Sequence, residues 1–286
     1  MSTRATLRQS ERFARRLARS HYENFLVASI LLPRRLRQPF YNIYAFCRTA
    51  DDVADESPDP ETALGGLRDL QCRIDDTFAG KTPQDSFFPA LAGTIATFRL
   101  DKKPFDDLLS AFRQDQHKTL YESDAELIDY CTRSANPVGR LVLALGDSLN
   151  ENTAPLSDHI CTGLQLANFW QDVSRDLKIG RIYLPADRRD KYGVDATMLQ
   201  GTETPPPVRE LLRELCEEAD ALFDRGLPLA DQVPNWLATD IRLFAHGGKE
   251  TLNAIRKIQY DVLRVRPKVG KMKQVRLVTR ALFGLL

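Results

Sequence analysis

Residues 168–176 read Asn-Phe-Trp-Gln-Asp-Val-Ser-Arg-Asp, and residues 48–56 read Arg-Thr-Ala-Asp-Asp-Val-Ala-Asp-Glu. Each stretch holds two aspartates four positions apart, and apolar or aromatic residues precede them. On an α-helix, residues at this spacing lie on one face, roughly 6 Å apart, so each stretch places two like charges side by side. The pattern predicts two helices that each present a pair of carboxylates to a ligand.

The two pairs, Asp51 with Asp55 and Asp172 with Asp176, are typical of a site for a divalent cation. Mg²⁺ prefers oxygen ligands and is commonly held by one or two carboxylates together with substrate phosphates. Metal ions and cationic side chains also stabilise the charge that develops when a diphosphate leaves carbon. Two pairs that face each other across a helical bundle would hold a diphosphate in this way. The alternative is an ordinary solvated helix face, because a single pair at this spacing is common.

Helical periodicity extends over most of the chain. Apolar residues recur at three- and four-residue steps, and no run of alternating apolar and polar residues predicts a strand. The longest irregular stretch, residues 180–206, is large for a structureless connection and is interpreted as a lid or flap. We expect an all-α fold with one domain over residues 1–286, a helical bundle around a central apolar cavity. The predicted helices span residues 62–78, 88–98, 105–114, 125–132, 136–145, 157–172, 207–224 and 236–244.

The composition is that of an ordinary globular protein, with 43% hydrophobic and 28% charged residues among 286. Its 40 basic and 39 acidic residues nearly balance, so the net charge indicates no partner. The five cysteines form no Cys-x-x-Cys pair, which argues against a zinc site and fits a reducing compartment. Apolar runs fall short of the roughly 18 residues of a membrane span, and no signal-peptide pattern opens the chain. We therefore expect a cytoplasmic protein.

The residues around the aspartates indicate a protein family more specifically than the spacing of the aspartates does. Residues 44–56 resemble the first aspartate-rich motif of the squalene/phytoene synthase family, and residues 163–185 resemble the second. Residues 130–139, with Tyr-Cys at the start and Val-Gly at the end, resemble the helix between those motifs. The resemblance runs from about residue 21 to about residue 267. It implies an isoprenoid-synthase-type helical fold and an enzyme that acts on an allylic or cyclopropylcarbinyl prenyl diphosphate.

The resemblance also implies which side chains form the site. Tyr130 lies where the family has a tyrosine implicated in proton handling or cation stabilisation; the alternative is a core tyrosine with its hydroxyl satisfied. No NADPH is expected. The implied Mg²⁺ ligands are Asp51, Asp55, Asn168, Asp172 and Asp176. The implied substrate-binding residues are His21, Asn24, Tyr44, Arg48, Asn168, Arg181 and Tyr183.

Three stretches resemble one branch of the family, the bacterial hydroxysqualene synthases of the hopanoid pathway: residues 21–25, 135–140 and 168–172. That resemblance implies conversion of presqualene diphosphate and water to hydroxysqualene and diphosphate. Tyr22 and Asn24 replace serines that squalene and phytoene synthases usually carry, and Glu250 or a neighbour stands near the place of a tyrosine on the last core helix. A condensing presqualene diphosphate, squalene or phytoene synthase is the alternative within the family.

Other classes of function fit the sequence less well. A di-iron bundle needs Glu-x-x-His pairs, and no histidine here has a glutamate three positions before it. A non-catalytic helical assembly factor of the same family would be expected to lose acids from its clusters, and both pairs are complete. The basic ends lack the interleaved aromatic residues that stack on bases, so nucleic-acid binding is not expected.

Both ends of the chain are basic. Residues 1–20 hold six arginines against one glutamate, and residues 262–286 hold no acid. In residues 268–286 the basic positions alternate with Val, Met, Leu and Phe, a pattern that predicts a basic amphipathic helix. Such a helix could associate peripherally with the inner membrane face, which would suit an enzyme of lipid substrates. The alternative is a last helix packed on the bundle.

Overall fold

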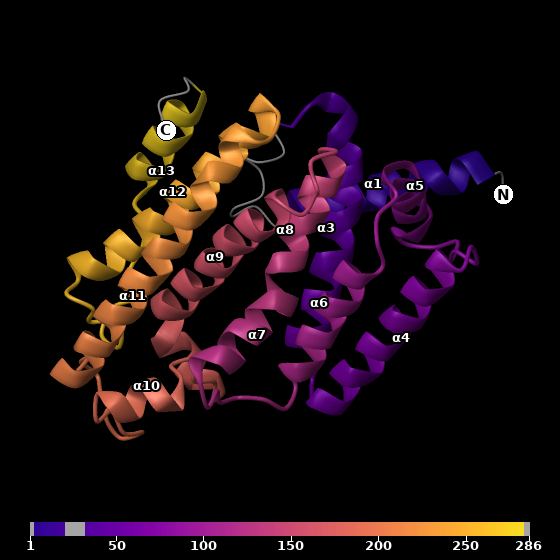
Figure 1. The fold of residues 1–286 in the computed structure, drawn as a ribbon. Coiled ribbons are helices and arrows are strands. Elements are labelled where there is room, and N and C mark those ends of the chain that lie inside the picture. The colour runs from indigo at the N-terminus through magenta and orange to yellow at the C-terminus, as the bar shows by residue number, and fades with distance from the viewer. Residues whose placement is uncertain (1–2, 21–31, 283–286) are drawn as a thin grey trace. The chain divides into compact units, whose positions relative to one another are not determined.

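The computed structural model describes residues 3–20 and 32–282, and these fold into helices joined by turns (Figure 1). Within this part of the chain the only extended pairing is an isolated bridge between Leu120 and Ile182. The prediction of an all-α fold is confirmed. The α-helices are α1 (Thr3–Ser20), α3 (Arg34–Asp55), α4 (Pro60–Phe78), α5 (Phe88–Phe98), α6 (Lys103–Gln114), α7 (Asp124–Ser134), α8 (Asn136–Leu145), α9 (Thr153–Asp176), α10 (Ala186–Lys191), α11 (Pro206–Gly226), α12 (Asn235–Lys257) and α13 (Lys271–Leu282), with 3₁₀ turns η1 (Leu177–Ile179) and η2 (Leu227–Asp231).

The helix bounds follow the apolar periodicity closely. Helices α5 and α8 have the predicted bounds, and α4, α6, α7, α9, α11 and α12 are longer than predicted at one or both ends. Residues 180–206 were expected to be irregular, but they contain the short helix α10. The basic segment at residues 3–20 is also a helix, in which Ser10 and Ala14 are buried.

The chain forms two compact units. The first comprises residues 1–117 and 137–150, and the second comprises residues 118–136 and 151–286. The prediction of a single domain over residues 1–286 stays a prediction. In the first unit α3 contacts α1, α4, α5 and α6. The Phe46 ring meets the Phe105 ring edge-on, with centroids 5.0 Å apart, and the Asn42 amide donates to the Ala90 carbonyl (3.1 Å).

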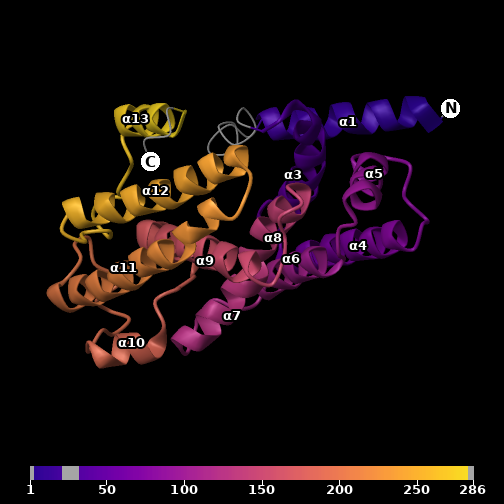
Figure 2. The same ribbon diagram turned by 45° about the horizontal axis from the view of Figure 1, so that its top comes forward.

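In the second unit α9, α11 and α12 lie side by side (Figures 1 and 2). The fully buried ring of Phe223 on α11 fills the space between two glycines, Gly163 on α9 and Gly248 on α12. A Cβ at Gly163 would lie 3.0 Å from this ring, and a Cβ at Gly248 would lie 2.2 Å from it. The absence of side chains at these positions lets the three helices approach closely. This packing fixes α9, the helix that carries the second aspartate pair.

Gly248→Ala is expected to destabilise the protein by about 1–3 kcal/mol, because the added methyl would collide with the rigid Phe223 ring. Gly247 is the matched control. It lies on the same helix, and a Cβ there would meet no atom within 4 Å. Gly247→Ala should therefore stabilise the protein by up to about 1 kcal/mol through helix propensity. Denaturant unfolding of both variants measures the difference, and equal effects would contradict this packing.

Asp240 on α12 is an acid in the core, with 4% of its surface exposed. Burial raises the pKa of its carboxyl from 3.8 to about 8. The folded protein thus holds a proton that the unfolded chain releases above about pH 4. The contribution of Asp240 to the free energy of unfolding is complete below the pKa of the unfolded chain. It falls by about 1.4 kcal/mol per pH unit as the pH rises toward 8, and above pH 8 it is lost.

Asp240→Asn should therefore raise the melting temperature relative to the natural protein by an amount that grows between pH 5 and pH 8.5. The amide keeps the size of the carboxyl and carries no charge at either pH. Asp101→Asn, at an exposed loop position, serves as the control and should show no such growth. A pH-independent difference for Asp240→Asn would mean that its carboxyl is ionised in the fold throughout this range.

The last described helix, α13, packs on α12. Lys273 forms an ion pair with Glu250 of α12, and Ala281 is buried. In the described ranges no helix combines the length and the apolar character that a membrane crossing requires.

Candidate functional site

The first aspartate pair lies at the C-terminal end of α3. Asp51 and Asp55 follow Arg48 along one face of the helix, and the Arg48 guanidinium is bound by neighbouring carboxylates. Its Nη1 lies 3.0 Å from Asp51 Oδ2, and its Nη2 forms an ion pair with Asp52 and lies 3.5 Å from Glu56 Oε1. One cation thus serves several acids. Helix α4 packs closely against this end of α3, because a Cβ on Gly66 of α4 would lie only 2.7 Å from the Val53 side chain.

Charge accumulates at this helix end in a partly buried setting. Burial is the largest cause that raises the pKa of the Asp51 carboxyl to about 6, the charge of Asp55 raises it further, and Arg48 opposes both. The pKa of the Tyr44 hydroxyl, one turn before Arg48, is also raised, chiefly by burial. The carboxylate pair therefore carries a repulsion that its arginine does not cancel, and a divalent cation would relieve it.

The second pair lies at the C-terminal end of α9, where Asn168, Asp172 and Asp176 occupy one face at four-residue steps. Arg266 reaches this face from the segment after α12. Its Nε forms an ion pair with Asp172, its Nη2 lies 3.1 Å from Asp172 Oδ2, and Nη2 also donates to Gln171 Oε1 (3.3 Å). This role of Arg266 was not predicted, because the sequence shows it only as one of several basic residues near the C-terminus.

The chain reverses direction directly after Asp176. The turn η1 ends at Gly180 in the left-handed conformation (φ 75°), and the Arg181 amide donates to the Asp176 carbonyl (2.9 Å). Burial is the main cause that raises the pKa of the Asp176 carboxyl to about 7; Asp172 adds to it, and Arg181 opposes it. Asp176, Arg181 and Tyr183 line one small cavity of about 10 Å³, so three predicted site residues come together here.

Aromatic rings surround this second group. Tyr183 stacks on Phe169 of α9, with centroids 3.7 Å apart and planes 10° apart, and on Tyr121 at 5.6 Å. The ring of Tyr130, buried on α7, lies 6.2 Å from Phe169 and 6.3 Å from Tyr183. Phe169 and Tyr121 were not predicted as site residues; Phe169 was noted only as an aromatic neighbour of the aspartates. A buried cluster of aromatic side chains therefore adjoins Asp176, which lines the same small cavity as Phe169 and Tyr183.

The predicted site residues fall into two groups, one in each unit. Tyr44, Arg48, Asp51 and Asp55 share α3 in the first unit. His21 and Asn24 lie outside the described residues, so their role stays a prediction. The second unit holds Tyr130, Asn168, Asp172, Asp176, Arg181 and Tyr183.

The donor set of each group suits Mg²⁺. Each helix presents two carboxylates in adjacent turns, and burial together with the charge of the neighbouring aspartate raises the pKa of Asp51 and of Asp176. Two carboxylates fill part of an octahedral shell, and Mg²⁺ commonly completes it with waters and substrate phosphate oxygens. Among the described residues, no group of three or more His, Cys, Asp or Glu side chains is arranged to hold a metal ion.

Residues 18–273 of this chain match the sequence model of the squalene/phytoene synthase family. A hydroxysqualene synthase of Rhodopseudomonas palustris is 36% identical over 217 residues, which cover 75% of this chain and 72% of the relative. A 15-cis-phytoene synthase of Synechocystis is 28% identical over 287 residues, covering 95% of this chain and 84% of the relative. The crystal structure of a squalene synthase, HpnC, from Alicyclobacillus acidocaldarius superposes with a TM-score of 0.84 at 40% identity, covering 91% of this chain and 99% of that one.

Proposed function

Because the chain belongs to the squalene/phytoene synthase family, we propose that it is a hydroxysqualene synthase acting on presqualene diphosphate. In this reaction the bond between carbon and the diphosphate oxygen breaks, and the electron pair leaves with the diphosphate. The resulting cyclopropylcarbinyl cation rearranges, and the oxygen of a water molecule forms a new bond to carbon. That water loses one proton, so the products are hydroxysqualene, diphosphate and a proton. No reductant takes part.

The observation that carries this proposal is the pairing of each carboxylate face with its own arginine. Arg48 lies against Asp51 on α3, and Arg266 lies against Asp172 on α9, with Arg181 following Asp176 in the chain. A site of this composition binds a polyanion through metal ions and guanidinium groups together. The similarity to hydroxysqualene synthases supports the choice of branch.

The residues that would hold Mg²⁺ are Asp51, Asp55, Asp172 and Asp176, with Asn168 beside the second pair. When bound, Mg²⁺ would neutralise the charge of the departing diphosphate. The guanidinium groups of Arg48 and Arg181 would bind diphosphate oxygens and stabilise the negative charge that develops on the leaving group.

The aromatic side chains suit the second half of the reaction. A carbocation needs surroundings that are apolar and poor in water, and the buried rings of Phe169, Tyr183 and Tyr130 contribute to such surroundings. We assign cation stabilisation to Tyr130. The hydroxyl of Tyr130, one of the three tyrosine hydroxyls in this cluster, is our choice for the group near the water that ends the cation.

A condensing synthase is the second candidate, because phytoene synthases align with nearly the whole chain. A substrate panel separates the two functions. Purified protein with Mg²⁺ is offered farnesyl, geranylgeranyl or presqualene diphosphate, without NADPH, and the lipid products are identified by mass spectrometry. We expect turnover of presqualene diphosphate alone. Conversion of farnesyl diphosphate to presqualene diphosphate, or of geranylgeranyl diphosphate to phytoene, would assign the chain to the condensing branch.

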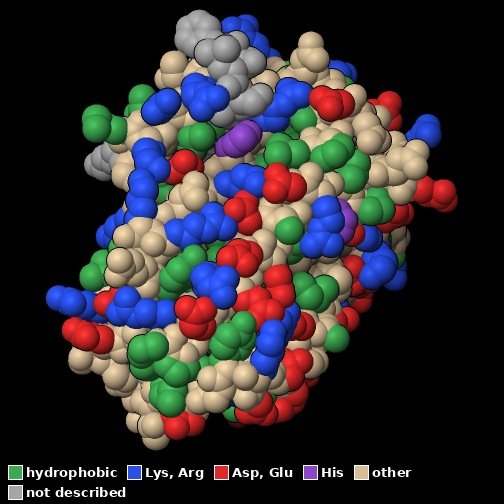
Figure 3. Space-filling view, turned by 60° about the vertical axis from the view of Figure 1, so that its left-hand side comes forward, with side chains coloured by type: hydrophobic (Ala, Val, Ile, Leu, Met, Phe, Trp, Pro, Cys, Tyr) green, Lys and Arg blue, Asp and Glu red, His purple; other side chains and the backbone are tan. Residues whose placement is uncertain are grey.

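We also propose that α13 attaches the enzyme to an anionic membrane surface, where its lipid substrate and product reside. Two apolar side chains on this helix face outward, Met272 with 88% and Val275 with 65% of their surfaces exposed. Figure 3 shows Lys and Arg side chains gathered over the upper part of the face on which α13 lies. Apolar side chains among basic ones match the requirements of a lipid surface with acidic head groups.

Co-sedimentation with vesicles that contain an anionic lipid tests this attachment. Met272→Glu should lower the bound fraction strongly, because it removes an apolar contact and places a negative charge on α13 that the anionic lipids repel. Leu149→Glu, at another exposed apolar position, should bind like the natural protein. High salt should release the natural protein. Equal binding by both variants would exclude α13 as the attachment.

A further inference from the structure

We propose that Arg188 is a positioning residue that fixes residues 181–187, the segment that carries Arg181 and Tyr183. The inference rests on the proposed function only where it assigns those two side chains to the diphosphate site. Arg188 lies on α10, inside the stretch that was interpreted from the sequence as a lid or flap. It has no place among the predicted site residues.

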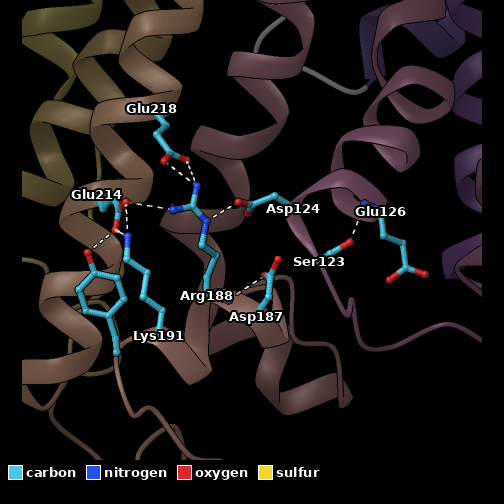
Figure 4. Close-up of polar contacts among 9 residues, drawn as sticks. Ser123, Asp124, Glu126, Asp187, Arg188, Lys191, Glu214 and Glu218 are labelled. Carbon is cyan, nitrogen blue, oxygen red and sulfur yellow. Dashed lines mark hydrogen bonds and ion pairs between the residues drawn. The ribbon is translucent and has the colours of Figure 1, made fainter.

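The guanidinium of Arg188 joins three helices (Figure 4). Its Nε forms an ion pair with Asp124, the first residue of α7. On the opposite side, Nη1 donates to Glu214 Oε1 (3.0 Å), and Nη2 donates to Glu218 Oε1 (2.6 Å) and Oε2 (2.7 Å). Both glutamates belong to α11 and lie one turn apart. Only 17% of the Arg188 side chain is exposed, so these contacts are better shielded than those of a surface ion pair.

Two further side chains strengthen the attachment of α10 to α11. Lys191 Nζ lies 2.8 Å from Glu214 Oε1 and 3.0 Å from Oε2, and the Tyr192 hydroxyl donates to the same carboxylate. These contacts, Lys191 first, lower the pKa of the Glu214 carboxyl to about 2. We call this set the α10 clamp: Arg188, Lys191 and Tyr192 on one side, Asp124, Glu214 and Glu218 on the other.

Backbone hydrogen bonds connect the α10 clamp to the site. The amide of Ile182 donates to the Thr119 carbonyl (2.8 Å), that of Ala186 to Tyr121 (2.9 Å), and that of Asp187 to Glu122 (3.0 Å). Residues 182–187 thus lie along residues 119–122. Just beyond this pairing, the side chains of Arg188 and Asp124 form their ion pair and close its end.

The side chains at the start of the paired segment are those of the site. Arg181 and Tyr183 flank Ile182, and the Tyr183 ring stacks between Phe169 and Tyr121. If the far end of the segment were free, the position of these side chains would depend more on the three backbone bonds and the ring stacking at its start. The α10 clamp attaches the far end of the segment to α7 and α11. This attachment fixes the positions of Arg181 and Tyr183.

Arginine is the side chain that this position requires. Its planar fork offers five N–H donors in fixed directions, which lets it bind carboxylates on opposite sides at once. A lysine would reach fewer of them, and a methionine would remove the cation that Asp124, Glu214 and Glu218 share. We therefore expect Arg188→Lys to retain part of the effect and Arg188→Met to lose it.

The test combines amide hydrogen exchange with kinetics on the full chain. In Arg188→Met, the amides of Ile182 and Ala186 should exchange about tenfold faster or more, while amides in the middle of α9 keep their rates. KM for presqualene diphosphate should rise by about tenfold with a smaller change in kcat, because Arg181 and Tyr183 would be held less firmly and would bind the diphosphate more weakly. Arg188→Lys should lie between the natural protein and Arg188→Met in both measurements.

Arg213→Met is the matched control. Arg213 also binds two carboxylates, Glu210 and Glu217 at 3.0 Å each, but all three belong to α11. Its loss should leave both exchange and KM unchanged. Unchanged exchange at Ile182 and Ala186 in Arg188→Met would overturn the positioning role. Faster exchange with unchanged KM would uphold the fixing of the segment and count against the assignment of Arg181 and Tyr183 to the diphosphate site.

Discussion

Asp176→Asn is expected to lower turnover roughly 10²-fold or more while it preserves or raises the melting temperature of the metal-free protein. The two effects have one cause. The Asp176 carboxyl has a pKa raised to about 7 by burial and by Asp172, so its charged form is unfavourable in the fold without a counter-ion. Asparagine removes that unfavourable charge and, with it, a carboxylate ligand for Mg²⁺. Asp51→Asn should behave in the same way, because the pKa of Asp51 is raised to about 6.

Asp69→Asn is the control for both variants. Asp69 is an exposed acid on α4 with an arginine 3.9 Å away, and its loss should change neither turnover nor stability measurably. Melting at about pH 8, where the acids are ionised, and initial rates at saturating Mg²⁺ give the comparison. A variant that is active at the natural rate, or one that is inactive because it unfolds, would contradict the role assigned to these carboxylates.

Removal of divalent metal should reduce turnover below detection, and Mg²⁺ in excess of the chelator should restore it. Each carboxylate pair supplies only part of an octahedral shell, so metal and diphosphate should bind cooperatively. The melting temperature should therefore rise more with Mg²⁺ and diphosphate together than the separate increments add up to, since ligands that bind the folded state stabilise it.

The same melting experiment with Asp51→Asn and Asp176→Asn provides the control, because both variants should lose most of the cooperative increment. Addition of Mg²⁺ alone should shift the natural protein little. Full turnover in the presence of a chelator would exclude a metal-dependent step. A cooperative increment that survives in both variants would place the metal on other residues.

The features predicted from the sequence are those that depend on residues close together in the chain. Helices such as α5 and α8 were located to the residue because their apolar positions repeat within the helix itself. The helix α1 was seen only as a basic segment. Its buried residues include Ser10, whose hydroxyl accepts from the Ala90 amide (3.0 Å), and its few apolar residues stand among six arginines, so the charge dominates the segment.

The site was predicted in part for the same reason. The two aspartate pairs are local patterns, and the sequence motifs around them are specific to a family. The partners that complete them come from far along the chain: Arg266 binds Asp172, 94 positions away, and Arg188 binds Asp124, 64 positions away. A single sequence does not show which of many arginines will meet which acid. Only the fold brings these charges together.

The product formed from presqualene diphosphate in ¹⁸O-labelled water tests the proposed function most directly. Purified protein is incubated with Mg²⁺ and presqualene diphosphate, without NADPH, and the lipid extract is examined by mass spectrometry. We predict hydroxysqualene that carries the heavy oxygen, and none from Asp176→Asn. Hydroxysqualene without the label, a hydrocarbon product, or no consumption of presqualene diphosphate would contradict the assignment.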